Sequence, residues 1–400
     1  MPLKLGRISQ QMQDMAKTMA HQLPAEENLL ERARDCLCSI RADALCEKLE
    51  WQSRQPVRMP WLVAMPRSAP QAALPTGLAD TAAPPSVPST FSVVGVDASS
   101  IPPDRHSSVH YYLVNVGYAL LTYGREPGAI LEASSQLCFR DEDLYVFPEK
   151  RDVPIEGTLL SARMEVEALH LLQQALDSRP WPTLALLDGP LILWTLQSET
   201  QEVRRALLQG FLSTMIFLKE TGVPLAGYVS YTGSRDVANS LRVWLCQGQP
   251  NECDRCASDD RELCLALAKI RDRELYAFLA DGERSQLFGS SSQILEEYGE
   301  QRVDFFYMNV GGEIVRVEVP GWVASDADLL SFVHAAIYDQ CQRSPSVPPY
   351  PPVLQEAHEQ AAITAPERRL VEEMVEQALG QYGQRVVRSA KEDSKRRRGV

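Results

Sequence analysis

The stretch Val93-Val94-Gly95-Val96-Asp97-Ala98-Ser99-Ser100 decides the fold that we expect for this chain. Three valines with a glycine among them predict a short buried strand, because β-branched residues favour strands. Asp97 ends this apolar run, where an isolated carboxylate would be costly to bury. We therefore expect Asp97 to be paired, hydrogen-bonded or bound to a cation.

A second stretch, Leu184-Ala185-Leu186-Leu187-Asp188-Gly189-Pro190, repeats the pattern of an apolar strand that ends in an aspartate. One such aspartate alone is equally compatible with a turn or a helix cap. Two such strands in one sheet would place both carboxylates at the same end of that sheet, which is a common way to hold a divalent cation. The pair therefore favours a metal site at Asp97 and Asp188.

The composition is that of a globular protein. A chain of 400 residues, 44% of them hydrophobic, can bury a large core in one large domain or two. We find no apolar run near the ~20 residues of a membrane span and no apolar secretory core at the amino terminus. We therefore expect a cytoplasmic protein without membrane association. The formal net charge of −13 argues against broad adhesion to nucleic acid, but a metal-binding nuclease remains compatible with it.

Four of the nine cysteines form a cluster with the spacing C-x6-C-x2-C-x7-C. The central C-x2-C pair has the spacing of a metal knuckle, so structural zinc or an iron–sulfur cluster are both reasonable. The first spacing is not that of a standard zinc finger, which leaves four reduced thiols as the alternative. The cluster consists of Cys246, Cys253, Cys256 and Cys264.

Changes in composition along the chain predict its organisation. Apolar residues at helical intervals predict a helical amino-terminal region over residues 1–65, and a Pro- and Ala-rich stretch predicts a linker over residues 66–90. The main domain should cover residues 91–380, with residues 245–300 as an insertion that carries the cysteines. We expect residues 381–400 to form a disordered basic tail.

The predicted order of elements in the main domain is strand, strand, strand, helix, strand, helix, strand. Hairpins come first and helical crossovers later, which predicts an α/β fold with a mixed sheet flanked by helices. The ribonuclease H-like fold has this order, and there acids on the first strand, the first helix and the fourth strand meet. Asp97 and Asp188 occupy the two strand positions, and Glu165 or Glu167 occupies the helix position. Helical periodicity does not separate these two glutamates.

An ordered set of segments resembles the NurA nuclease family over about residues 91–380. The segments are V-G-V-D-A-S-S, L-A-L-L-D-G-P-L, A-G-Y-V-S, L-A-D-G-E-R-S-Q-L-F, F-F-Y-M-N-V-G-G-E-I-V-R-V-E-V-P-G-W-V-A and Y-P-P-V-L-Q-E-A-H. The resemblance implies a manganese-dependent 5′-to-3′ DNA exonuclease that also cuts single strands. It implies work in DNA end resection with a HerA-type hexameric ATPase, a ribonuclease H-like core and a homodimer.

The resemblance also implies a set of site residues. Asp97 and Asp188 match the family's two strand-end metal ligands, and its helix glutamate falls on Glu167 or Glu165. We prefer Glu167, because Arg163 lies one turn before it. Tyr350 and His358 match the family's carboxyl-terminal tyrosine and histidine. The family usually has Asp-Gly-Ser at the first strand, whereas this chain has a small alanine at position 98.

The expected chemistry is hydrolysis of a phosphodiester bond with two cations about 4 Å apart. Carboxylates suit Mn²⁺ or Mg²⁺, and one imidazole favours Mn²⁺. Asp97 would bridge the cations, Asp188 and the helix glutamate would each hold one, and His358 would bind a cation or move a proton. Two alternatives remain: a catalytically weak subunit that caps a translocase ring and guides DNA, and a protein that binds nucleic acid through the cysteine knuckle.

Overall fold

We describe the protein from a computed structural model. It describes residues 4–55, 61–67, 77–105, 107–176, 182–247, 256, 258–384 and 386, and within the first helix the side chains of residues 20–25 are left out. Cys253, part of the expected linker and the basic tail from residue 387 onward lie outside the described residues. The chain divides into two compact units. The first unit comprises Met1–Ala83, Ser230–Ser292 and Phe305–Arg316, and the second comprises Pro84–Val229, Gln293–Asp304 and Val317–Val400.

The second unit contains five neighbouring strands of a mixed sheet, in the order β9-β8-β3-β4-β5. β4 runs antiparallel to both β3 and β5, whereas β8 runs parallel to both β3 and β9. This order and these directions confirm the expected ribonuclease H-like sheet. The strands are β3 (Phe91–Ile101), β4 (Tyr112–Tyr123), β5 (Gly128–Cys138), β8 (Thr183–Asp188) and β9 (Leu225–Val229).

Helices flank this sheet, as the sequence predicts. α5 begins after Thr200, whose side chain accepts a hydrogen bond from Val203 N, and it ends at Gly222 in the left-handed conformation (φ 71°). The principal helices are α4 (Thr158–Ala175), α5 (Gln201–Thr221), α10 (Ala327–Gln342), α11 (Pro352–Ala361) and α12 (Ala365–Gln381). Shorter elements are α3 (Asp141–Leu144), β6 (Tyr145–Phe147), β7 (Asp152–Pro154), the 3-10 segment Gln293–Gln301 and α9 (Gly321–Ala324).

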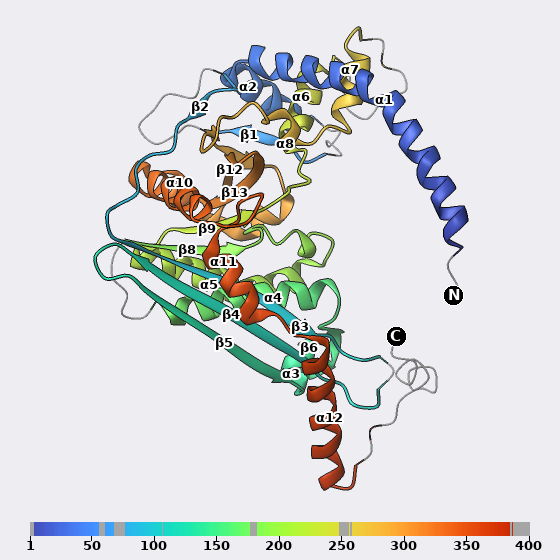
Figure 1. The fold of residues 1–400 in the computed structure, drawn as a ribbon, viewed down its shortest axis with the longest axis vertical. Helices are drawn as coiled ribbons and strands as arrows, with labels where there is room; N and C mark the ends of the chain where they lie inside the picture. The colour runs from blue at the N-terminus through green and yellow to red at the C-terminus, as the bar shows by residue number, and fades with distance from the viewer. Residues whose placement is uncertain are drawn as a thin grey trace. The chain divides into compact units, whose positions relative to one another are not determined.

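The two faces of the sheet differ in what covers them, because side chains alternate along each strand. Val94 and Val96 of β3 lie in the hydrophobic core that includes Leu169 and Leu172 of α4. The intervening residues, Gly95 and Asp97, point to the opposite face. There α11 packs against β3 and β4, as Figure 1 shows for the red helix over the teal strands.

Glycines let α11 approach this face closely. An added Cβ on Gly95 would lie 2.8 Å from the carbonyl oxygen of Val353. One on Gly117 would lie 2.3 Å from the carbonyl oxygen of Ala357 and 2.4 Å from the backbone nitrogen of Ala361. Gly95 of β3 therefore allows close packing against α11, a helix that begins more than 250 residues later in the chain.

Replacing Gly117 by alanine is expected to destabilise the second unit by about 3 kcal/mol, the upper end of the range for overpacking a core. The clashing atoms belong to the helix backbone, which cannot rotate away as a side chain can. Gly128→Ala on β5 is the matched control, since a Cβ there meets nothing within 4 Å. Thermal unfolding of the two variants checks this. Equal unfolding temperatures would contradict the close approach of α11.

The first unit joins the amino-terminal helices to the cysteine-containing segment in one hydrophobic core. Leu37 and Leu45 pack there with Leu263, Leu275 and residues of a β-hairpin. The segment expected as an insertion therefore shares a core with the amino-terminal region. The elements are α1 (Leu5–Ser39), α2 (Ala42–Ser53), β1 (Ala64–Pro66), β2 (Thr81–Ala82), α6 (Asp236–Leu245), α7 (Arg261–Leu267), α8 (Asp272–Leu275), β10 (Arg284–Ser285) and β11 (Phe288–Ser290).

The hairpin of β12 (Val303–Val310) and β13 (Glu313–Pro320) forms as predicted, turning at Gly311 and Gly312. Its middle, Phe305–Arg316, belongs to the first unit. Phe305, Phe306 and Tyr307 are fully buried. Among the helices of the described part of the chain, none has the length and apolar character needed to cross a membrane.

Candidate metal centre

Asp97 and Asp188 lie side by side because they occupy neighbouring positions on two parallel strands. β8 ends at Asp188, whereas β3 continues past Asp97 to Ile101, so the expectation that the first strand ends at Asp97 is wrong. The register of β3 and β8 runs through Val96 opposite Leu187, and the two aspartates are the next residue on each strand. Asp97 Oδ1 also accepts a hydrogen bond from the backbone nitrogen of Ala98, at 2.7 Å. Both side chains are partly buried. The strand pattern alone therefore brings these two carboxylates together.

His358 reaches the same place from α11. Its Nδ1 lies 2.7 Å from Asp97 Oδ2, and its side chain is 60% exposed. Asp97, Asp188 and His358 each offer one ligand atom, and these atoms lie within 4.8 Å of one another. Among the described residues, this is the group of His, Cys, Asp and Glu side chains that is arranged to hold a metal ion.

The carboxyl-terminal end of α11 is fixed to the sheet. Asn115 Nδ2 donates hydrogen bonds to the carbonyl oxygens of Gln360, at 3.0 Å, and of Ala361, at 2.8 Å. Ser99 Oγ also donates to the carbonyl oxygen of Ala361. The last carbonyls of a helix have no partner within the helix, so these side chains satisfy them and set the position of His358.

Tyr350 completes the surroundings of Asp188. Its hydroxyl donates a hydrogen bond to the Asp188 carboxylate, and its ring packs edge-on against Tyr228, with 5.5 Å between the ring centroids. Burial raises the pKa of Tyr350, and the charge of Asp188 raises it further. Burial also raises the pKa of Asp188, although the Tyr350 hydrogen bond opposes this. Tyr350 therefore stays protonated and acts as a donor.

Glu165, rather than Glu167, lies near the aspartates. Burial raises the pKa of Glu165 to about 8, and the charges of Asp97 and Asp188 add to the effect. Its Oε1 would stand 3.8 Å from a Cβ on Gly189, the residue that follows Asp188. Glu165 is thus the helix glutamate that α4 presents to the two aspartates, which favours Glu165 over the preferred Glu167.

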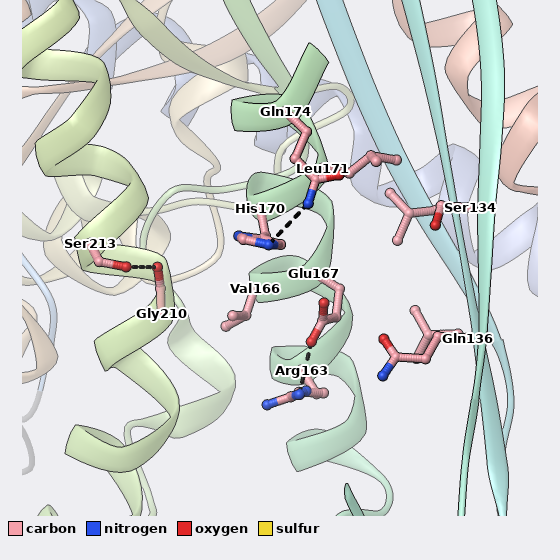
Figure 2. A pocket seen from close by; sticks show the side chains of 12 residues that line it. Ser134, Gln136, Arg163, Val166, Glu167, His170, Leu171, Gln174, Gly210 and Ser213 are labelled. Carbon is pink, nitrogen blue, oxygen red and sulfur yellow. Dashed lines mark hydrogen bonds and ion pairs between the residues drawn. The ribbon is translucent and has the colours of Figure 1, made fainter. Parts of the chain in front are cut away.

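Glu167 points elsewhere. It forms an ion pair with Arg163, 2.9 Å away and one turn earlier on α4. Figure 2 shows this pair facing Gln136 of β5, in a groove of 620 Å³ between α4, α5 and the outer strands. The Arg163 spacing that favoured Glu167 thus marks an ordinary i, i+4 ion pair on the helix surface.

A buried clamp holds the segment after Asp188. Glu318 is fully buried, and its Oε2 accepts hydrogen bonds from the backbone nitrogens of Leu191, at 2.8 Å, and Ile192, at 3.1 Å. The Tyr298 hydroxyl donates to the carbonyl oxygen of Leu191, at 2.8 Å. Sequence reasoning missed this clamp. The signal for it in the sequence was a glutamate between two valines, Val317-Glu318-Val319.

The described residues offer no support for a metal site at the cysteines. Cys253 lies outside them, and the other three are partly buried. The group of possible ligands that the described residues bring together consists of Asp97, Asp188 and His358 and includes no cysteine. Zinc or an iron–sulfur cluster therefore remains a prediction from spacing alone.

Comparisons with known proteins agree with the resemblance. The family model of the NurA domain matches residues 91–363, more than half of the 400 residues. The crystal structure of the NurA nuclease from Sulfolobus solfataricus is 13% identical and covers 93% of this chain and 97% of its own, with a TM-score of 0.49. A crystal structure of NurA with manganese is 12% identical and covers 74% and 91%, with a TM-score of 0.34. No curated protein matches the chain.

Proposed function

The chain belongs to the NurA family, and from this premise we propose that it is a metal-dependent nuclease that hydrolyses phosphodiester bonds in DNA. The observation that carries the proposal is the convergence of the ligand atoms of Asp97, Asp188 and His358, which lie within 4.8 Å of one another. These residues come from three separate elements of the fold.

The donor set fits a divalent cation. Two carboxylates and one imidazole suit Mn²⁺ or Mg²⁺, and the imidazole favours Mn²⁺. Burial raises the pKa values of Asp188 and Glu165, and at Asp188 the hydrogen bond from Tyr350 offsets this only in part. A bound cation would compensate their negative charges. Asp97, Asp188 and His358 are therefore the proposed ligands, with Glu165 beside them.

The residues have distinct proposed roles. When bound, the cations would activate a water and offset the charge that develops on the phosphate. Asp97 is hydrogen-bonded to His358 and is next to Asp188 on the neighbouring strand, so it is the residue that would contact both cations. Tyr350 holds the Asp188 carboxylate in place through its hydrogen bond. His358 is exposed enough to bind a cation or to exchange a proton with the reacting groups.

Family membership supports the finer proposals. They are 5′-to-3′ exonuclease action, cutting of single strands, work in DNA end resection beside a HerA-type hexameric ATPase, a homodimer and a cytoplasmic location. The direction is tested with linear duplexes labelled at either the 5′ or the 3′ end. Early release of the 5′ label as a mononucleotide is the expected result, and early release of the 3′ label would contradict it.

The nuclease proposal itself predicts a strict metal requirement. The purified protein should degrade linear DNA with Mn²⁺, more slowly with Mg²⁺, and not at all with EDTA. Degradation that persists in EDTA would contradict the assignment of the metal centre. If no divalent cation supports cleavage although DNA is bound, the ring-capping, DNA-guiding subunit becomes the better interpretation.

A further inference from the structure

Tyr231 is an exposed aromatic residue with an unusual backbone. It lies in the first unit, in the loop that precedes α6, and it is 70% exposed. Its φ of 43° is in the left-handed region, which bulky residues seldom adopt. Such a conformation costs free energy and persists only when the surrounding structure holds it, and it often marks a functional position.

Two side chains hold Tyr231 in this conformation. The Tyr231 backbone nitrogen donates a hydrogen bond to Glu313 Oε1, at 2.6 Å. Arg273 Nη1 donates to the carbonyl oxygens of Tyr231 and Thr232, at 3.0 Å each. The Arg273 guanidinium also lies 3.6 Å from the centroid of the Tyr231 ring. The ring is therefore fixed in place, with the cation on one face and most of its surface open to solvent.

The base of this arrangement is rigid. The backbone nitrogen of Asp272 donates to the carbonyl oxygen of Ser234, at 2.9 Å, which ties the Arg273 segment to the Tyr231 loop. The Asp272 carboxylate is fully buried and accepts hydrogen bonds from the backbone nitrogens of Val237 and Ala238. Hydrogen bonds of Asp272 therefore join the two segments that carry Tyr231 and Arg273.

Positive charge lies on the same two segments. Arg235 and Arg271 are exposed, and Arg235 Nη1 donates to the carbonyl oxygen of Ala268, at 2.6 Å. The nearby acids are Glu313 and Glu274, which accept hydrogen bonds from backbone nitrogens of these segments, and the buried Asp236 and Asp272. Asp236 also forms an ion pair with Arg316, at 3.2 Å. Arg235 and Arg271 are thus the exposed cations of these two segments that a negatively charged partner can contact.

We propose that Tyr231 and Arg273 form a stacking platform for an unpaired base of single-stranded DNA, with Arg235 and Arg271 available to its phosphates. This rests on the proposed nuclease function and adds a substrate-binding site to it. A ring that is already fixed loses little conformational entropy when a base stacks on it. Proteins that bind single strands combine aromatic rings with arginines in this way. The platform gives a reason for the strained backbone at an exposed tyrosine.

The test measures binding of an oligodeoxynucleotide that carries 2-aminopurine, in EDTA so that cleavage does not interfere. Stacking on Tyr231 should quench the fluorescence of the base. Tyr231→Ala should weaken binding by about 5- to 150-fold and abolish the quenching, because a base–aromatic stack contributes that range. Tyr231→Phe should bind and quench as the wild type does. Tyr382→Ala removes another exposed tyrosine, 85% exposed, and should change neither signal.

Other outcomes would overturn the proposal. Wild-type binding and quenching in Tyr231→Ala would show that no base stacks there, even if the protein cleaves DNA. Equal losses in Tyr231→Phe and Tyr231→Ala would assign the effect to the hydroxyl group and not to stacking. Equal affinity for an RNA oligonucleotide of the same sequence would overturn the assignment to DNA. If the protein fails to cleave DNA but its binding of the oligonucleotide still depends on Tyr231, the proposed nuclease function is wrong and the proposed stacking site stands.

Discussion

Replacing Asp97 or Asp188 by asparagine is expected to slow DNA cleavage in saturating Mn²⁺ by at least about 1000-fold. A bound cation contributes several kcal/mol to the transition state, and each 1.4 kcal/mol is a factor of ten in rate. Asparagine keeps the shape of the side chain but removes the charge that the cation needs. Initial rates on an end-labelled linear duplex measure the loss.

The fold should survive these substitutions. Burial disfavours the ionised form of Asp188, so removing its charge should not lower the unfolding temperature. In Asp188→Asn, the amide oxygen of the new side chain would still be able to accept the hydrogen bond from Tyr350. Glu132→Gln is the matched control, since it removes an exposed carboxylate from β5 of the same sheet. Cleavage at the wild-type rate by folded Asp97→Asn and Asp188→Asn proteins would mean that the reaction takes place elsewhere.

The helix glutamates provide the second discriminating experiment. Glu165→Gln is expected to weaken Mn²⁺ binding and to slow cleavage by about 100-fold, as loss of a charged group beside a metal does. Glu167→Gln should cost only the ion pair with Arg163, about 0.5 kcal/mol of stability, and leave cleavage unchanged. The two substitutions are chemically identical and lie two residues apart on one helix. The reverse result would restore Glu167 as the ligand.

The pH dependence of metal binding separates the glutamates further. The pKa of Glu165 is about 8, so below pH 8 its carboxyl group is mostly neutral and must release a proton before it can stabilise a cation. Mn²⁺ affinity should therefore rise as the pH increases toward 8 and become nearly constant above it. Titration calorimetry in buffers of different ionisation enthalpy measures the released proton. In Glu165→Gln this part of the pH dependence should disappear, whereas Glu167→Gln should retain it.

The two aspartates could be predicted because their signal is local. Each follows an apolar run, and the register of the parallel strands β3 and β8 places the two residues side by side. A local pattern could not decide which helix glutamate lies beside the aspartates. Residues 165 and 167 are separated by about 200° around a helix, and both border its apolar face. Which of them turns toward Asp97 depends on how α4 is rotated against the sheet, and that is decided by packing.

The sequence by itself determined the order of strands and helices, the mixed sheet and the two carboxylates that follow apolar runs, because these depend on short-range hydrophobic patterns. Only the tertiary structure decided which other side chains join them. His358 lies 261 residues after Asp97, and it reaches that carboxylate because Gly95 and Gly117 leave room for the backbone of α11. Contacts of this kind depend on how segments that are distant in the sequence pack together, and no single segment of the chain determines that packing.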